Sequence, residues 1–304
     1  MTDLSLKNRI LALVVFAFSA LILSVRSALY FTMVLFLCLG LVLFFADKLI
    51  DNQKVKARTA FAFFVSAACY QTFYQIFNRV HDNNKQLMTA SAIAFFLAAV
   101  FAATDIKKLP YCILAAPLIC FLDTRIAGAY CILLFTLSIV KIRLVPKQNK
   151  SGKKKNSKNN SQKSEPNQVT VIIVSIIVSL GCLSFCLYTV FQNENRTTET
   201  LDYLLRYFKN TLGFSILIVY FIIKLMRSNV KAKVAVIIGI ILHIAAAYLY
   251  WINYGWSFAS LFIISTALFL GLICLESSDI IDSIKEDYHK HKYIFFVEFL
   301  LLLQ

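Results

Sequence analysis

Long stretches without a charged residue constrain this chain more than any other feature. Six of them have close to the ~20 residues that a helix needs to cross ~30 Å of hydrocarbon. They lie at 27–46, 59–77, 87–103, 169–191, 234–252 and 257–275. No water inside a bilayer can bond to a backbone amide, so a crossing segment must be a helix or a strand of a closed barrel. None of the six alternates apolar and polar residues as barrel strands do, so we predict helices.

The composition also indicates a membrane protein. Hydrophobic residues make up 59% of the chain and charged residues only 15%, whereas about a quarter of the residues in soluble domains are charged. This difference excludes a soluble enzyme. Four shorter apolar runs lie at 10–25, 109–122, 126–140 and 211–226. We therefore predict an all-α fold, a polytopic transmembrane helical bundle of about ten full spans.

Two regions leave their geometry open. The run 109–122 contains Pro110 and Pro117, so together with 126–140 it forms either two thin spans or a re-entrant hairpin. The last segment, 293–304, is too short to cross a bilayer at 1.5 Å per residue. We therefore expect a truncated or interfacial C-terminal segment, as in a fragment of a longer open reading frame.

Lysine and arginine sort to one side of the expected bundle. Cytoplasmic loops of membrane proteins are enriched in these two residues. If the N-terminus is cytoplasmic, 24 of the 31 lie in inner segments and 7 in outer ones. We therefore predict a multi-pass protein of the cell membrane with its N-terminus inside. The net charge of +15 then reflects retention and attraction to anionic membrane lipids, not binding to nucleic acid.

A Lys-, Asn- and Ser-rich segment divides the chain. Residues 146–168 carry no large apolar residue, so burial cannot offset the entropy of ordering them, and we predict a disordered cytoplasmic linker. It separates a six-span bundle at 1–145 from a four-span bundle at 169–304. Apolar residues at helical spacing also predict amphipathic helices near 200–209 and 278–290.

All eight cysteines lie within predicted spans, where cysteine behaves as a small apolar residue. Cys182 and Cys186 share a helix face, but two thiols alone make a poor metal site. The sequence therefore predicts no disulfide framework, no metal site and no cofactor.

Ionisable residues at membrane depth are candidates for function. His243 lies at the midpoint of 234–252, where it would bind a polar headgroup or relay protons. The alternative is a neutral histidine bonded to a carbonyl or hydroxyl of a neighbouring helix.

A second group of candidates falls at the outer mouth of the first six helices. Arginine binds phosphate oxygens through its planar fork, and a carboxylate can act as general base on an acceptor hydroxyl. We assign substrate binding to the arginines and catalysis to two aspartates. The alternative is ordinary interface arginines, with Asp123 and Arg125 screening each other. The group comprises Arg26, Arg79, His81, Asp82, Asp123 and Arg125, with Asp82 and Asp123 as the catalytic pair.

Two short segments each place a Ser/Thr–Arg step between apolar runs: Leu23-Ser24-Val25-Arg26-Ser27-Ala28 and Leu122-Asp123-Thr124-Arg125-Ile126-Ala127. This step resembles the one that opens a helix in O-antigen polymerase and ligase-like proteins, and in polytopic glycosyltransferases that use polyprenyl-phosphate sugars. The Tyr-Gln step in Ala68-Cys69-Tyr70-Gln71-Thr72-Phe73-Tyr74 is also similar to one in some of those glycosyltransferases. The resemblance implies that Arg26 and Arg125 hold the phosphate of a polyprenyl-(di)phosphate-linked sugar.

Three functions follow from these features. The first is assembly of cell-surface polysaccharide or glycoconjugate, with lipid-linked sugars transferred or polymerised at the outer leaflet. The second is a transporter or lipid flippase, which His243 and Pro117 would suit. The third is the membrane-anchoring region of a larger enzyme.

The predicted orientation has a direct test. An epitope inserted at Ser157, within the linker, is expected to be labelled only after the cell membrane is permeabilised. Labelling of this epitope on unbroken cells would show that the predicted topology is wrong.

Overall fold

The computed structural model describes residues 25–45, 52–80, 84–144, 168–194, 211–230 and 232–303, with 202, 205 and 208 between them. These ranges contain helices and no strand, as the charge-free runs predict. The elements are α2 (Val25–Phe45), α3 (Gln53–Ala68), α4 (Tyr70–Asn78), α5 (Lys85–Thr104), η2 (Ile106–Leu114), α6 (Ala115–Leu122), α7 (Thr124–Leu144), α8 (Gln168–Phe191), α10 (Leu212–Arg227), α11 (Lys233–Tyr254), α12 (Trp256–Cys274) and α13 (Ser278–Leu303).

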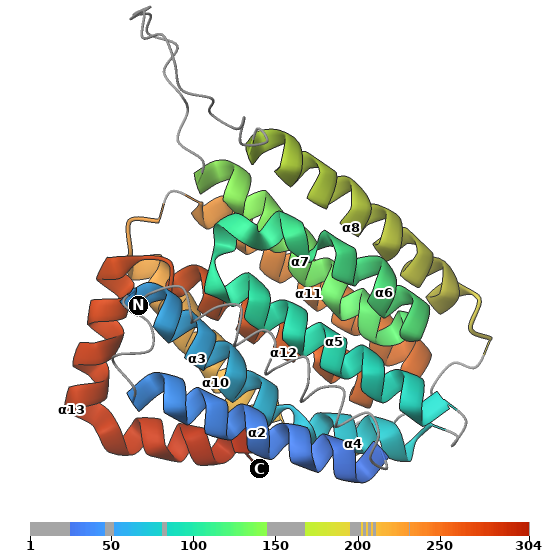
Figure 1. The fold of residues 1–304 in the computed structure, drawn as a ribbon, viewed down its shortest axis with the longest axis horizontal. Coiled ribbons are helices and arrows are strands. Elements are labelled where there is room, and N and C mark those ends of the chain that lie inside the picture. The colour runs from blue at the N-terminus through green and yellow to red at the C-terminus, as the bar shows by residue number, and fades with distance from the viewer. Residues whose placement is uncertain are drawn as a thin grey trace, which may run out of the picture.

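The helices run side by side, so their ends gather at two ends of the bundle (Figure 1). At one end, which we call the lysine-rich end, Lys285 Nζ donates to Gln53 Oε1 over 2.8 Å. At the other, the Arg125 end, Asn193 Nδ2 donates to the carbonyl oxygen of Asn253 over 2.7 Å. Segments predicted to be inner meet at the first end, and segments predicted to be outer meet at the second.

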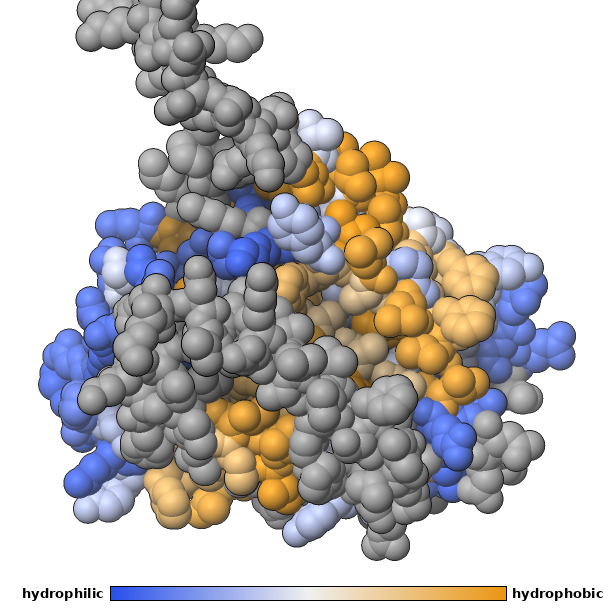
Figure 2. All heavy atoms as spheres, viewed as in Figure 1, coloured by the Kyte–Doolittle hydropathy of each residue, from blue (hydrophilic) through white to orange (hydrophobic). Residues whose placement is uncertain are grey.

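Within the described ranges, five helices are long and apolar enough to cross a membrane. They are Lys85–Thr104, Thr124–Ile142, Val169–Phe191, Lys233–Tyr254 and Trp256–Cys274. Hydrophilic side chains gather at the two ends of the molecule and apolar ones lie between them (Figure 2). The all-α bundle with membrane-length helices is therefore confirmed, whereas the finer number of ten full spans stays a prediction.

Two short helices follow one another between residues 106 and 122. Nine residues form the 3₁₀ helix η2, which contains Pro110, and eight form α6. A 3₁₀ helix rises ~2.0 Å per residue against ~1.5 Å in an α-helix, so the two together reach ~30 Å. The choice between two thin spans and a re-entrant hairpin, which the sequence left open, stays a prediction.

Helix α12 forms the centre of the bundle. Burial covers 94% of its span, and it packs against α3, α4, α7, α10 and α11. The predicted six-span and four-span bundles therefore share one core. Residues 145–167, which hold nearly all of the predicted linker, lie outside the described part.

Helix α13 changes direction at His291, whose backbone leaves the helical region at φ −130° and ψ 37°. Before the kink, in the segment 278–290 that is predicted to be an amphipathic helix, Ile280 and Ile281 are buried. After the kink, the apolar segment lies along α10, and its Leu301 backbone approaches Gly213 so closely that a Cβ there would lie 2.9 Å from it. Of the segment 200–209, only Asp202, Leu205 and Phe208 are described, and all are exposed.

Polar bonds attach the first half of α13 to α10. Lys224 forms an ion pair with Asp287 and donates to Ser283 Oγ over 2.6 Å. The hydroxyl of Tyr220 donates to Asp287 Oδ2 over 3.0 Å. Lys224, which could reach water by extending its side chain, instead finds a carboxylate on the neighbouring helix.

This attachment predicts a dependence of stability on pH. Partial burial raises the pKa of Asp287. The bonds from Lys224 and Tyr220 lower the pKa by more than burial raises it, so the pKa lies below its usual value. A lowered carboxyl pKa stabilises the fold above the unfolded pKa of ~3.9, and this stabilisation is lost as the pH falls through the folded value. We expect Lys224→Met to lower the unfolding temperature in detergent at pH 7 and to weaken this acid-dependent loss.

The matched control is Lys290→Met. Lys290 pairs with Glu286 within α13, and both side chains are largely exposed, so this pair contributes little to stability. An equal decrease of the unfolding temperature in both variants would contradict the assigned role of Lys224.

Candidate functional site

The site begins where α6 ends and α7 starts. Asp123 lies between them with an extended backbone, φ −157° and ψ 114°. Its Oδ1 accepts the backbone N–H of Arg125 over 2.8 Å and that of Ile126 over 3.1 Å. These amides have no partner inside the helix, and aspartate is one of the residues favoured to cap them. Asp123 is therefore the N-cap of α7.

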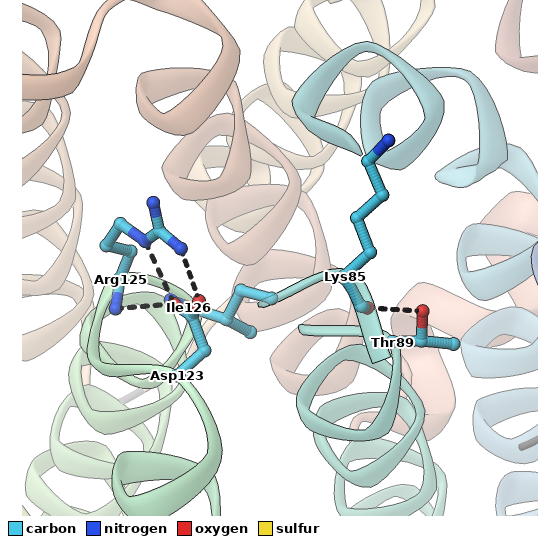
Figure 3. A network of polar contacts seen from close by, with 5 residues as sticks. All are labelled: Lys85, Thr89, Asp123, Arg125 and Ile126. Atoms are coloured by element: carbon cyan, nitrogen blue, oxygen red, sulfur yellow. Dashed lines mark hydrogen bonds and ion pairs between the residues drawn. The ribbon is translucent and has the colours of Figure 1, made fainter. Parts of the chain in front are cut away.

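The same carboxylate holds the arginine side chain. Arg125 donates from Nε to Oδ1 over 3.3 Å and from Nη2 to Oδ2 over 2.7 Å (Figure 3). Its guanidinium carbon lies 4.9 Å from the ring centre of Phe258. The side chain of Asp123 is 6% exposed and that of Arg125 is 24% exposed. The alternative left open by the sequence, a mutual Asp123–Arg125 pair, is the arrangement observed.

These contacts bear on the role of Asp123. Four N–H groups share its two oxygens, whereas a general base needs an oxygen directed at the proton it removes. The geometry favours a positioning role for Asp123. Its catalytic role stays a prediction.

Further cations lie at the Arg125 end. Lys85 opens α5, and its side chain extends toward the same side as the guanidinium of Arg125 (Figure 3). Arg79 follows α4 and is exposed. Since α5 and α7 both begin here, the positive ends of two helix dipoles add to these charges. Sequence reasoning missed Lys85 as a site residue, although its position directly before an apolar run marks it as interfacial.

The remaining predicted members of this group are not placed. Arg26 belongs to the first turn of α2, but its side chain lies outside the described part. Asp82 and His81 also lie outside the described residues. The structure thus brings together Asp123 and Arg125 and puts Arg79 at the same end of the bundle.

His243 lies at a junction of three helices. It is 1% exposed, its Nδ1 bonds to the carbonyl oxygen of Gly239 on α11 over 2.7 Å, and its Nε2 lies 3.1 Å from Ser265 Oγ on α12. Ser265 Oγ also lies 3.2 Å from the carbonyl oxygen of Ala129 on α7. Both ring nitrogens have protein partners, which favours the structural alternative over substrate binding.

A buried charged cluster lies at the lysine-rich end and was not predicted. Arg58 and Lys141 are 6% and 7% exposed. Burial raises the pKa of Glu276, against the opposing effect of Arg58 and Lys141. Burial likewise lowers the pKa of Arg58, against the effect of Glu276 and Asp105. The cluster joins α3 and α7 to the loops after α5 and α12. Because unpaired buried charges are costly, its opposite charges favour the packing of these segments against one another.

Two hollows in the described part have volumes of about 20 and 30 Å³, roughly room for one water each. They lie between α2, α3, α4 and α5, and between α10 and α11. Neither hollow would hold a sugar or a diphosphate.

The fold and the site define a class, an all-helical protein with helices suited to span a membrane. Comparison with known proteins takes the assignment no further, since no family model, curated protein sequence or solved structure matches the chain.

The dual role of Asp123 predicts different costs for two substitutions. Asp123→Asn should keep the cap, because asparagine accepts the same backbone N–H groups, and should lose only the ion pair. Asp123→Ala should lose both, with the cap alone worth about 0.5–2 kcal/mol. The measurement is the free energy of unfolding in detergent micelles.

Asn52 provides the matched control, since it caps α3 at an exposed position through the backbone N–H of Lys54 and that of Val55. Asp123→Ala should cost more than Asn52→Ala. Equal costs would show that the bonds to Arg125 add no stability.

Proposed function

We propose that the protein is a multi-pass protein of the cell membrane, with its N-terminus and the linker at 146–168 in the cytoplasm. The lysine-rich end is then the cytoplasmic face and the Arg125 end is the outer face. The sorting of cations between the two ends supports this orientation.

At the outer face, we propose that the protein transfers or polymerises lipid-linked sugars in the assembly of cell-surface polysaccharide or glycoconjugate. The observation that carries this proposal is the fixed guanidinium of Arg125. Its two bonds to Asp123 use two of its five N–H groups, which leaves donors for the oxygens of a polyprenyl (di)phosphate. Lys85 and Arg79 add positive charge at the same end.

An apolar stripe beside this site suits the lipid tail. Leu114, Leu118 and Phe121 are 79%, 53% and 86% exposed, and their spacing puts them on one face. The stripe ends two residues before Asp123. A diphosphate at Arg125 would then lie at headgroup level, with the polyprenyl chain along this stripe.

The roles of the acidic residues follow from their surroundings. Asp123 orients Arg125, and it would serve as a base only after releasing the guanidinium. Asp82 is then the favoured general base on the acceptor hydroxyl. Arg26, which matches Arg125 in the family resemblance, would contribute a second phosphate contact.

The two other functions have less support. A transporter or flippase would use a charged or titrating group near the midplane, and His243 is engaged by Gly239 and Ser265. A membrane-anchoring role would not require a fixed arginine at the outer face.

The test is binding of a polyprenyl diphosphate to the protein in phosphatidylcholine nanodiscs. Arg125→Gln is expected to weaken binding tenfold or more, because a hydrogen bond between charged groups is worth about 1.5–3 kcal/mol. Arg227→Gln, at the lysine-rich end, is the control and should bind as the unaltered protein does. The matched ligand without phosphate, a polyprenol, should bind weakly to all three proteins. Equal binding of the two ligands, or unchanged binding by Arg125→Gln, would refute the proposal.

A further inference from the structure

Three helices bring cysteine sulfurs to one point in the bundle. Cys120 lies on α6, Cys131 on α7 and Cys186 on α8, and their Sγ atoms all lie within 4.8 Å of one another. The Sγ atoms of Cys120 and Cys186 are 3.7 Å apart. Cys131 and Cys186 are fully buried, and Cys120 is 9% exposed. Cys182 lies one helical turn before Cys186 on α8.

We propose that Cys120, Cys131 and Cys186 form a binding site for a soft, thiophilic metal ion, with monovalent copper as the favoured ion. Clustered thiols select Cu(I), zinc or iron–sulfur clusters from among biological metals. The sequence predicted no metal site because only Cys182 and Cys186 share a helix face. The packing of α6 and α7 against α8 supplies the two further sulfurs.

The geometry suits a single ion. Metal–sulfur bonds of ~2.3 Å require neighbouring sulfurs ~3.8 to 4.0 Å apart, in tetrahedral or trigonal arrangement respectively. The observed separations need only small side-chain movements to meet this condition. Structural zinc sites almost always have four protein ligands. Three sulfurs lie within mutual reach here, and Cys182 is a fourth thiol beside Cys120 and Cys131. The charge of the ion, not the number of thiols, therefore favours copper over zinc.

The surroundings also suit a monovalent ion. In an apolar interior an uncompensated charge is costly. A Cu(I) ion that displaces one thiol proton to solution forms a neutral copper–thiolate, and the other two sulfurs complete its coordination. Since protons leave on binding, affinity should rise with pH.

A neighbouring hydroxyl provides an independent observation. Tyr250 is 1% exposed, and its hydroxyl has no hydrogen-bond partner in the part of the chain that the structure describes. The hydroxyl lies against Gly128, where any Cβ would overlap it. Gly128 precedes Cys131 by three residues on α7. Buried hydroxyls are nearly always bonded, and the thiolate that metal binding creates would offer this one an acceptor.

A disulfide between Cys120 and Cys186 is the competing chemistry. It would require the sulfurs to approach from 3.7 Å to ~2.05 Å. It would also leave the buried Cys131 without a role, whereas a metal ion uses all three sulfurs.

The experiment titrates Cu(I) into the purified full chain in detergent under anaerobic, reducing conditions, with bicinchoninate as the competing chelator. One copper per chain is expected, and Cys186→Ser should weaken its binding at least a hundredfold. The control is Cys69→Ser, a fully buried thiol whose bond to the carbonyl oxygen of Val65 a serine hydroxyl can replace. It should bind copper as the unaltered protein does.

X-ray absorption of copper in the unaltered protein provides a readout that needs no variant, and only sulfur neighbours are expected. The proposal is overturned if no copper resists the chelator, if Cys69→Ser loses copper equally, or if zinc binds more tightly than copper. A Cys120–Cys186 disulfide peptide from chains in native membranes would also overturn it. None of these outcomes depends on the proposed sugar chemistry.

Discussion

The need to bond every backbone amide without water determines the architecture of this protein. Each long apolar run satisfies its own amides as a helix, and the remaining exceptions lie at helix ends. Asp123 shows how one such end is satisfied, because its carboxylate accepts two free N–H groups of α7. The residue that caps the helix is therefore also the one that fixes Arg125, and the candidate site arises from the requirements of the fold.

Polar contacts within the bundle are concentrated where helices of distant sequence meet. His243 joins α11 to α12, Ser265 extends that contact to α7, and Lys224 attaches α10 to α13. Apolar packing distinguishes poorly between helix neighbours in lipid, since lipid tails are as apolar as leucine. These bonds therefore favour the observed helix neighbours, in addition to the apolar core that surrounds α12.

The sequence predicts the helical class and the alternation of helix ends, because charge-free length and cation sorting are local properties. It also offered the Asp123–Arg125 pair as one of two interpretations. It could not predict the burial of Arg58 and Lys141, because counting charges along the sequence does not distinguish an exposed cation in a loop from a buried one. The meeting of Cys120 and Cys131 with Cys186 depends on the packing of three helices, and no spacing within the chain encodes it.

Helix α8 contributes Cys186, yet only 22% of its span is buried. It packs mainly against α7, with a hydrogen bond between Ser138 and Ser175 over 3.0 Å. A helix so widely exposed to lipid adjusts its tilt when the hydrocarbon layer becomes thinner or thicker. Such a change of tilt would alter the distance from Cys186 to Cys120 and Cys131. Lipid composition would then act on the geometry of the thiol cluster without touching it.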